Sequence, residues 1–173
     1  DGTLLKAHAI ILAADGTARK LNIPGDDENF GQGVSYCATC DGFFFRDKTV
    51  AVVGGGDTAL EDALYLSKIT RKVYLIHRRD TFRGDKVFQD KVLAQKNIEV
   101  LFDTVPREIV GQEQVDGLKV ENVKTGDGSV LAVQGVFIFV GITPQTSFVP
   151  EQVDLDANGF VVTDTEMRTS VPG

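Results

Sequence analysis

Through the middle of the 173-residue chain, short apolar runs alternate with segments whose apolar residues recur at helical spacing. Residues 49–53 and 72–76 are apolar and rich in β-branched side chains, which indicates buried strands. Between them, residues 57–67 carry apolar side chains at the three- and four-residue spacing of a helix. The same spacing over 83–96 predicts a second helix, and a third strand follows over 98–102. This alternation predicts an α/β fold with a doubly wound parallel sheet.

The flanking segments carry a weaker pattern. Residues 107–133 contain short alternating runs separated by turn formers such as 125–128, which predicts an added antiparallel β-meander. The apolar run 136–140 predicts a return to the core sheet. Near the two ends of the chain, 6–13 is apolar enough for a buried strand, and 160–162 predicts a short strand.

Composition and charge narrow the classes of function. The chain is 42% apolar with a net charge of −7, so it is an ordinary globular sequence without the basic face that nucleic acid requires. Its longest apolar stretches, 7–14 and 136–142, fall well short of the ~20 residues of a membrane-spanning helix. No targeting segment is recognisable at the start. We therefore expect a cytoplasmic protein with neither a nucleic-acid nor a membrane partner.

A glycine-rich turn joins the first of these strands to the first helix. It has the form G-x-G-x-x-A and consists of Gly54, Gly55, Gly56, Asp57, Thr58 and Ala59. Gly54 suits a tight turn, Gly56 lets backbone N–H groups approach a pyrophosphate, and Ala59 lets the helix pack close to the strand. The helix N-terminus then offers unpaired N–H donors to the phosphates. Because a predicted strand precedes it and a predicted helix follows, the turn indicates a Rossmann-like dinucleotide site more than a purely structural turn.

The end of the second strand indicates which dinucleotide binds. An NAD site places Asp or Glu about 20 residues after the glycine turn to accept the ribose hydroxyl. Here the residues are His77, Arg78 and Arg79, followed by Arg83. Guanidinium groups match phosphate oxygens and keep their charge, so the segment predicts NADPH, bound through its 2′-phosphate, over NADH. The alternative is a solvated charge cluster without a ligand.

The two cysteines, Cys37 and Cys40, are too few for a secreted disulfide scaffold. Their spacing allows a small disulfide ring at a helix start or tight turn, and such pairs make a thiolate available near neutral pH. Asp41 follows directly and is placed to pass protons during exchange. Zinc usually takes four ligands, and the chain adds only His8 and His77, so we favour redox chemistry and expect no metal.

Three motifs together resemble the low-molecular-weight thioredoxin reductases of bacteria in sequence, order and spacing. They are 37–45 with both cysteines, 50–66 with the glycine turn, and 77–83 with the arginines. Further likeness at 21–25 and 141–144 extends the resemblance over nearly the whole chain. The resemblance implies a flow of electrons from NADPH to FAD, then to the cysteine disulfide, and finally to thioredoxin.

The resemblance also implies roles for single residues. Cys40 corresponds to the sulfur that faces the flavin, Cys37 to the one that attacks the partner disulfide, and Asp41 to the acid/base. Arg78, Arg79 and Arg83 correspond to the clamp on the 2′-phosphate. The full set of expected cofactor contacts is Gly54, Gly55, Gly56, Asp57, Thr58, Ala59, His77, Arg78, Arg79, Arg83 and Gly141.

A division into domains follows from the same resemblance. Residues 1–30 are expected to be the end of an FAD domain with a linker, 31–160 the NADPH-binding domain with the cysteine pair, and 161–173 the start of a return to the FAD domain. The polar stretch 26–33, rich in turn formers, is expected to link two domains. The resemblance implies hinges for domain rotation near 25–33 and again near the C-terminus. The resemblance further implies a homodimer.

The family's FAD fingerprint is absent, and Ala14-Asp15 stands where the family usually has Thr-Gly near the flavin. We therefore expect the chain to bind NADPH and hold a dithiol, but neither to retain FAD nor to turn over alone. Two other functions stay open: a reductase of another disulfide partner, such as a peroxiredoxin, and a stand-alone NADPH-binding or redox-sensing module. A ferredoxin-fed reductase would not need Arg78 and Arg79.

Overall fold

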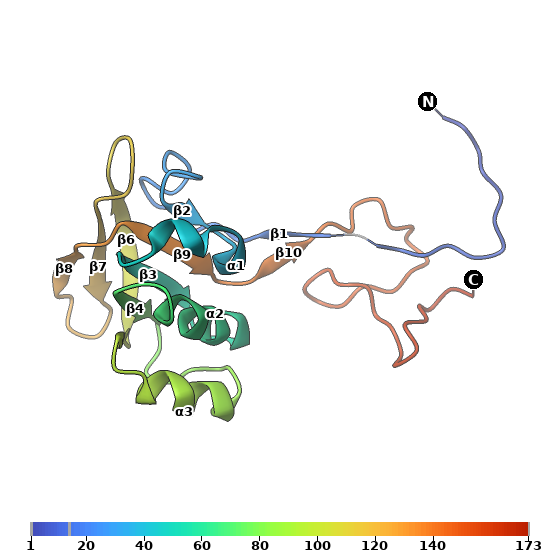
Figure 1. The fold of residues 1–173 in the computed structure, drawn as a ribbon. Helices are drawn as coiled ribbons and strands as arrows, with labels where there is room; N and C mark the ends of the chain where they lie inside the picture. Colours follow the sequence, from blue (N-terminus) through green and yellow to red (C-terminus); the bar gives the residue numbers. More distant parts are fainter. Residues whose placement is uncertain (1, 14, 173) are drawn as a thin grey trace. The chain divides into compact units, whose positions relative to one another are not determined.

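A computed structural model describes residues 2–13 and 15–172 (Figure 1). The chain divides into two compact units, of which the larger is Arg19–Val140 and the smaller combines the segments up to Ala18 and from Gly141. These bounds differ from the expected domain boundaries at residues 30 and 160. The assignment of the flanking segments to an FAD domain is a matter of function and stays a prediction.

A five-stranded parallel sheet in the order β2-β9-β3-β4-β5 is the centre of the larger unit. Its strands are β2 (Val34–Ser35), β3 (Thr49–Gly54), β4 (Lys72–Ile76), β5 (Ile98–Leu101) and β9 (Gly135–Phe139). Strands β4 and β5 follow β3 on one side, whereas β9 pairs with its other side. The winding therefore reverses at β3, which confirms the predicted parallel α/β fold.

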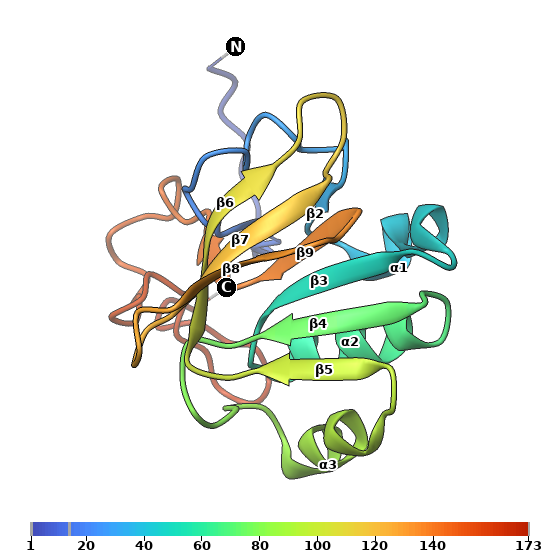
Figure 2. The same cartoon turned by 90° about the vertical axis from the view of Figure 1, so that its left-hand side faces the viewer.

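Two different layers cover the sheet, as Figure 2 shows. The helices α2 (Asp57–Ser67) and α3 (Lys86–Ala94) pack on one face. The predicted meander covers the other face as the antiparallel strands β6 (Thr104–Val110), β7 (Gly117–Asn122) and β8 (Gly128–Leu131). Side chains of β3 alternate between the two: Val50 and Val52 join the core on the helix side, and Ala51 and Val53 the core on the meander side. Burial on both faces explains the continuous apolar run.

Helix α3 is shorter than the expected 83–96 because the residues before it hold a different contact. The N–H groups of Arg83 and Gly84 donate to the Gly55 carbonyl at 2.8 and 3.1 Å. Asp85 then caps the helix, accepting a hydrogen bond from the N–H of Val87 at 2.8 Å. The start of α3 is therefore fastened to the glycine turn.

The segment 25–33, expected to link two domains, is a loop that belongs to the larger unit. The side chains of Asp26 and Asn29 are buried. Asp26 Oδ2 accepts hydrogen bonds from the N–H groups of Leu21 at 2.8 Å and Asn22 at 3.0 Å. Asp26 and Asn29 thus satisfy backbone groups inside the loop, whereas Asp27 and Glu28 are exposed. The role of this segment as a hinge stays a prediction.

The smaller unit contains one antiparallel pair, β1 (Gly16–Ala18) with β10 (Ile142–Pro144). The strand expected over 160–162 is reduced to an isolated bridge between Leu155 and Val161. One bridge supplies too few ladder hydrogen bonds to make a strand.

The buried strand expected over 6–13 is wrong. These residues form no strand, and Ile10 and Ile11 are 74% and 92% exposed. A strand needs a partner for its backbone N–H and C=O groups, and no described strand pairs with this segment. The expectation at Ala14-Asp15 falls in part on Ala14, which lies outside the described residues.

Candidate functional site

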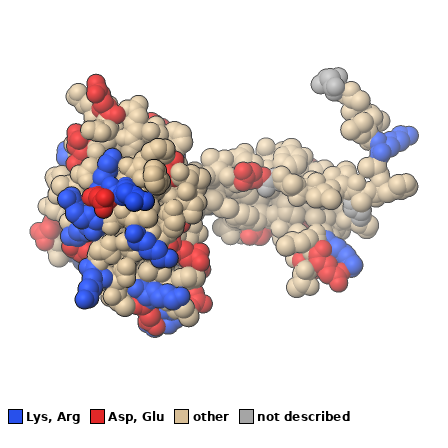
Figure 3. Space-filling model, in the orientation of Figure 1, with Lys and Arg blue, Asp and Glu red and all other residues tan. Residues whose placement is uncertain are grey.

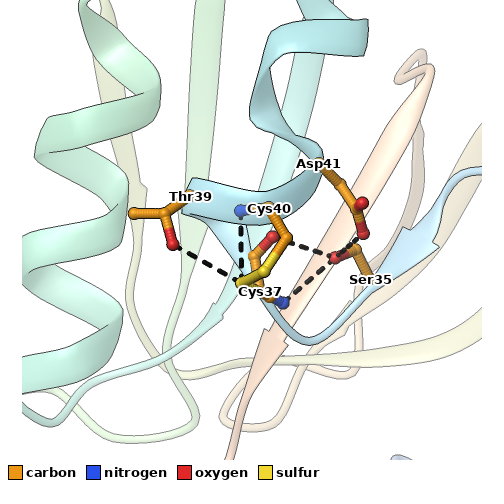
Figure 4. The surroundings of a disulfide bond; sticks show 5 residues. All are labelled: Ser35, Cys37, Thr39, Cys40 and Asp41. Carbon is orange, nitrogen blue, oxygen red and sulfur yellow. Dashed lines mark hydrogen bonds between the residues drawn. A yellow bond between two sulfur atoms is a disulfide. The ribbon is translucent and has the colours of Figure 1, made fainter.

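The two cysteines form a disulfide at the start of a short helix (Figure 4). Cys37 precedes α1 (Ala38–Asp41), so the small ring predicted from the spacing is confirmed. The N–H of Cys40 donates to Cys37 Sγ at 3.2 Å. This contact stabilises negative charge on Cys37 once the disulfide is reduced. As whole residues, Cys40 is exposed and Cys37 half-buried.

The carboxylate of Asp41 turns toward a buried serine (Figure 4). Ser35 Oγ donates to Asp41 Oδ2 at 2.6 Å and accepts a hydrogen bond from the N–H of Cys37 at 3.0 Å. The serine therefore links the expected acid/base to the backbone of the expected nucleophile. Sequence reasoning missed Ser35, because a lone serine two residues before a cysteine carries no signal of its own.

The glycine turn lies between β3 and α2, where the motif predicts it. Gly54 has a φ of +154°, and a Cβ there would lie 2.5 Å from the Phe139 carbonyl oxygen and 2.7 Å from Ala59 Cβ. Ala59 is fully buried, so strand and helix approach closely at these two positions. Gly56 differs, because its φ is −93° and a Cβ would meet no described atom within 4 Å. Open space over Gly56 leaves its backbone accessible to a ligand.

His77 follows β4 and packs against Gly55, where a Cβ would lie 2.2 Å from His77 Nδ1. The ring is 7% exposed, lies beside Phe82 with 5.6 Å between ring centroids, and has no partner for Nε2 among the described residues. Burial lowers the pKa of His77, and the charges of Arg79 and Arg78 lower it further. The imidazole is therefore neutral at pH 7 and supports the strand tip between the glycine turn and the arginines.

The three arginines of the expected clamp lie on this strand tip and the loop after it. Arg78 and Arg79 come directly after His77, and the backbone N–H of Arg83 binds the carbonyl of Gly55. All three side chains are exposed, and none makes an ion pair within the described part of the chain. The fold thus brings the arginines to the carboxyl ends of the parallel strands, where the glycine turn also lies.

Asp80, the acid inside the arginine segment, is bound by a lysine from the meander. Its carboxylate lies 3.3 Å from the Nζ of Lys124, and the same Nζ lies 3.0 Å from Asp103 Oδ2. The hydrogen bond from Lys124 and its positive charge lower the pKa of Asp80. Sequence reasoning missed Lys124, which is 44 residues from Asp80 and shares no local pattern with it. The pairing leaves the neighbouring guanidinium groups without an acidic partner.

Three further residues expected to contact the cofactor are Asp57, Thr58 and Gly141. Asp57 and Thr58 are exposed in the first turn of α2. Asp57 Oδ1 accepts a hydrogen bond from the N–H of Asp85 at 2.6 Å, so its carboxylate fastens the loop before α3. Gly141 has a φ of +109° and belongs to the smaller unit, so it is not among the residues that the larger unit brings together.

A separate hollow of about 730 Å³ lies between the loop that starts at Pro24 and the turn from β6 to β7. Its lining includes Glu28, Glu108, Glu113 and Asp116, and neither lysine nor arginine is part of it. The negative charge disfavours the phosphates of a dinucleotide. The glycine turn is therefore the better cofactor site.

Two phenylalanines beside the disulfide are exposed. Phe43 and Phe44 lie in the 3₁₀ turn η1 (Gly42–Phe45) directly after α1, and they are 67% and 70% exposed. Arg46 lies over the ring of Phe43 at 5.4 Å. Large exposed aromatic groups are enriched where proteins bind partners, so these two extend the candidate site beyond the residues chosen from the sequence.

The described residues contain no group of three or more His, Cys, Asp or Glu side chains that could hold a metal ion. Within the same described ranges, no helix has the length and apolar character required to cross a membrane. On the face that Figure 3 shows, basic side chains gather over the larger unit with acidic ones among and around them. This face is mixed in charge and not uniformly basic.

A parallel sheet that joins a glycine turn, an arginine-bearing strand tip and a Cys-x-x-Cys disulfide defines a nucleotide-linked disulfide redox domain. The family model for pyridine nucleotide-disulphide oxidoreductases matches residues 1–173. The chain therefore belongs to the pyridine nucleotide-disulphide oxidoreductase family.

Within this family, the chain is similar to curated relatives and solved structures that are named thioredoxin reductase. The chain is 44% identical over 173 residues to the thioredoxin reductase of Streptomyces coelicolor, covering 99% of this chain and 54% of the relative. It is 46% identical over 167 residues to that of Treponema pallidum, covering 96% and 54%. The crystal structure of Lactococcus lactis thioredoxin reductase matches with a TM-score of 0.83 at 42% identity, over 91% of this chain and 52% of that one. The chain thus spans about half the length of these relatives.

Proposed function

We propose that this chain is the NADPH-binding, dithiol-bearing portion of a thioredoxin reductase. Electrons pass from NADPH through FAD to the Cys37–Cys40 disulfide and on to thioredoxin. The likeness to proteins named thioredoxin reductase supports this reaction. The 173 residues hold a single G-x-G-x-x-A turn, which we assign to NADPH. FAD is then bound by other parts of the whole protein, so we expect the chain alone to retain no FAD and not to turn over.

The observation that carries the NADPH assignment is the set of unpaired guanidinium groups beside the glycine turn. A 2′-phosphate carries up to two negative charges, and Arg78, Arg79 and Arg83 offer three positive ones on the segment that follows β4. An NADH site would present a free carboxylate at this position. Here the carboxylate of Asp80 is bound by Lys124 and does not compete for the arginines.

The dithiol chemistry follows from the surroundings of the two sulfurs. When bound, NADPH and FAD would supply the two electrons that reduce the Cys37–Cys40 disulfide. Following the resemblance, we assign the sulfur of Cys40 to the flavin side. The thiolate of Cys37, stabilised by the Cys40 N–H, attacks the thioredoxin disulfide and forms a mixed disulfide while one partner thiolate leaves. Cys40 then attacks the sulfur of Cys37, which restores the internal disulfide and releases reduced thioredoxin. Asp41 exchanges the accompanying proton.

The position of Phe43 and Phe44 next to the disulfide supports a protein as the electron acceptor. Their exposed rings provide an apolar anchor for a partner whose own disulfide must approach Cys37. The resemblance to the reductases adds a homodimer and a cytoplasmic location for the complete protein. Sedimentation of the full-length protein and fractionation of cells test these two expectations.

We also assign the segments of the smaller unit to the FAD domain. The division of the chain into compact units supports boundaries between the two domains near residues 18 and 141 instead of 30 and 160. The packed loop over 25–33 supports this shift, because it belongs to the larger unit. Limited proteolysis of the full-length protein should then cut near residues 18 and 141 and spare 25–33.

The proposal is tested by adding NADPH and oxidised thioredoxin to the chain, with and without a flavin-loaded domain supplied separately. We expect thioredoxin to be reduced only when the flavin domain is present. Reduction without it would favour the stand-alone module. The chemically reduced chain, without NADPH, should reduce about one equivalent of thioredoxin. A failure of that step would contradict the thioredoxin assignment while leaving NADPH binding untouched.

A further inference from the structure

The hydroxyl of Ser35 lies at the centre of a small, partly buried network of hydrogen bonds (Figure 4). Strand β2 holds this serine in the parallel sheet, opposite Phe137 of β9, and leaves it 3% exposed. Its Oγ lies 2.6 Å from Asp41 Oδ2, 3.0 Å from the N of Cys37 and 3.2 Å from the O of Cys37. One rigidly placed oxygen therefore contacts both the carboxylate and the backbone of the redox loop.

The serine has one proton and two acceptors within reach, which are Asp41 Oδ2 and the Cys37 carbonyl. When Asp41 is ionised, the proton points to its carboxylate. When Asp41 is protonated, its own O–H donates to Ser35 Oγ, and the serine proton turns to the carbonyl of Cys37. The N–H of Cys37 donates to Oγ in both states. Every buried donor keeps a partner whether or not Asp41 carries its proton.

We propose that Ser35 is the positioning residue for Asp41, keeping its carboxyl group in one place while it gains and loses a proton. The inference rests on the proposed role of Asp41 as acid/base. A carboxyl group that changes charge also changes what it can donate and accept, so with a fixed partner it would have to move. Rotation of one hydroxyl removes that need. No proton is gained or lost by Ser35 in the process, and the only proton that enters or leaves is the one on Asp41.

The test uses NMR of the full 173-residue chain in its disulfide form, in which the cysteines do not titrate. The carboxyl carbon of Asp41 and the backbone amide of Cys37 are followed together across a pH titration. We expect both signals to change with one midpoint, because protonation of Asp41 changes the hydroxyl that accepts from the Cys37 N–H. Asp26 accepts a hydrogen bond from the hydroxyl of Tyr36, next to Cys37, at 3.1 Å, and its carboxyl carbon is followed in the same spectra together with those of Glu61 and Asp62 on α2.

Three variants make the result specific. Ser35→Ala should uncouple the Cys37 amide from Asp41, and Ser35→Thr, which keeps a hydroxyl, should restore the coupling. Ser67→Ala is the matched control, because it removes another buried hydroxyl that donates to the Leu64 carbonyl at 2.8 Å, and it should leave the coupling intact. Asp41→Asn, which keeps Ser35 in place, should abolish the response, so the test does not depend on Ser35→Ala folding well.

A kinetic measurement completes the test. We expect Ser35→Ala to slow reduction of thioredoxin by the chemically reduced chain about tenfold, and Ser67→Ala to leave the rate unchanged. The inference is overturned if the Cys37 amide signal of the unmodified chain does not change with the midpoint of Asp41. It is equally overturned if the amide signal changes with that midpoint to the same extent in Ser35→Ala. Failure of the proposed function shows differently, as an unmodified dithiol that does not reduce thioredoxin even when the NMR coupling is present.

Discussion

Substitution of Gly56 is expected to lower the affinity for NADPH without changing the free energy of unfolding. In Gly56→Ala the added Cβ meets no described atom within 4 Å, and the backbone φ of −93° suits alanine. The loss of chain entropy in the unfolded state stabilises by about 0.4–1 kcal/mol, and the poorer N-cap of α2 costs a similar amount. The free energy of unfolding should therefore stay within about 0.5 kcal/mol of its original value. The methyl group does, however, occupy the space where we place the pyrophosphate.

Gly54→Ala should show the opposite pattern. Its Cβ would lie 2.5 Å from a backbone carbonyl oxygen at a φ of +154°, which combines overpacking with backbone strain. We expect a loss of roughly 2–6 kcal/mol in urea unfolding, against almost none for Gly56→Ala. Calorimetric titration with NADPH should show Gly56→Ala binding ~10–100-fold more weakly than the unmodified chain. If Gly56→Ala keeps full NADPH affinity, the glycine turn is structural and the cofactor assignment fails.

Three other changes probe the strand tip. Arg78→Ala should weaken NADPH binding about ten- to a hundredfold and barely change NADH binding, and equal losses measured by calorimetry would rule out a phosphate contact. Lys124→Met frees Asp80 to compete for the arginines and should weaken NADPH binding roughly three- to tenfold, whereas Lys119→Met, which breaks the pair with Glu108, should not. Burial lowers the pKa of His77 below its ordinary 6.5, so the unfolded chain takes up this proton first as the pH falls. Urea unfolding should therefore show stability declining below about pH 6.5, and His77→Gln should flatten that part of the profile.

Local patterns predicted the centre of the fold. Strands β3 and β4 and helix α2 were predictable because they pack against one another within one βαβ unit, whose pattern is local in the sequence. The apolar run over 6–13 has the same composition as a core strand, yet it finds no pairing strand among the described residues. Composition alone does not reveal whether a partner strand exists.

The candidate site was predictable where chemistry sits within one motif. The Cys37–Cys40 ring and the turn around Gly54 could be read from spacing, because chain geometry fixes those contacts locally. Ser35 and Lys124 could not be predicted, because their contacts depend on how distant segments pack. Ser35 is placed by the pairing of β2 with β9, and Lys124, in the turn between β7 and β8, contacts Asp80 after β4. The burial of Asp26 could not be predicted for a related reason, since its carboxylate accepts hydrogen bonds from the backbone of its own loop.

The central assignment is that the tip of β4 holds the 2′-phosphate of NADPH. Calorimetric titration of the chain with NADPH and with NADH, at one salt concentration, measures this directly. We expect NADPH to bind at least about tenfold more tightly, because only NADPH carries the phosphate that the free guanidinium groups match. Equal affinities, or tighter binding of NADH, would contradict the assignment and remove the source of electrons from the proposed reaction.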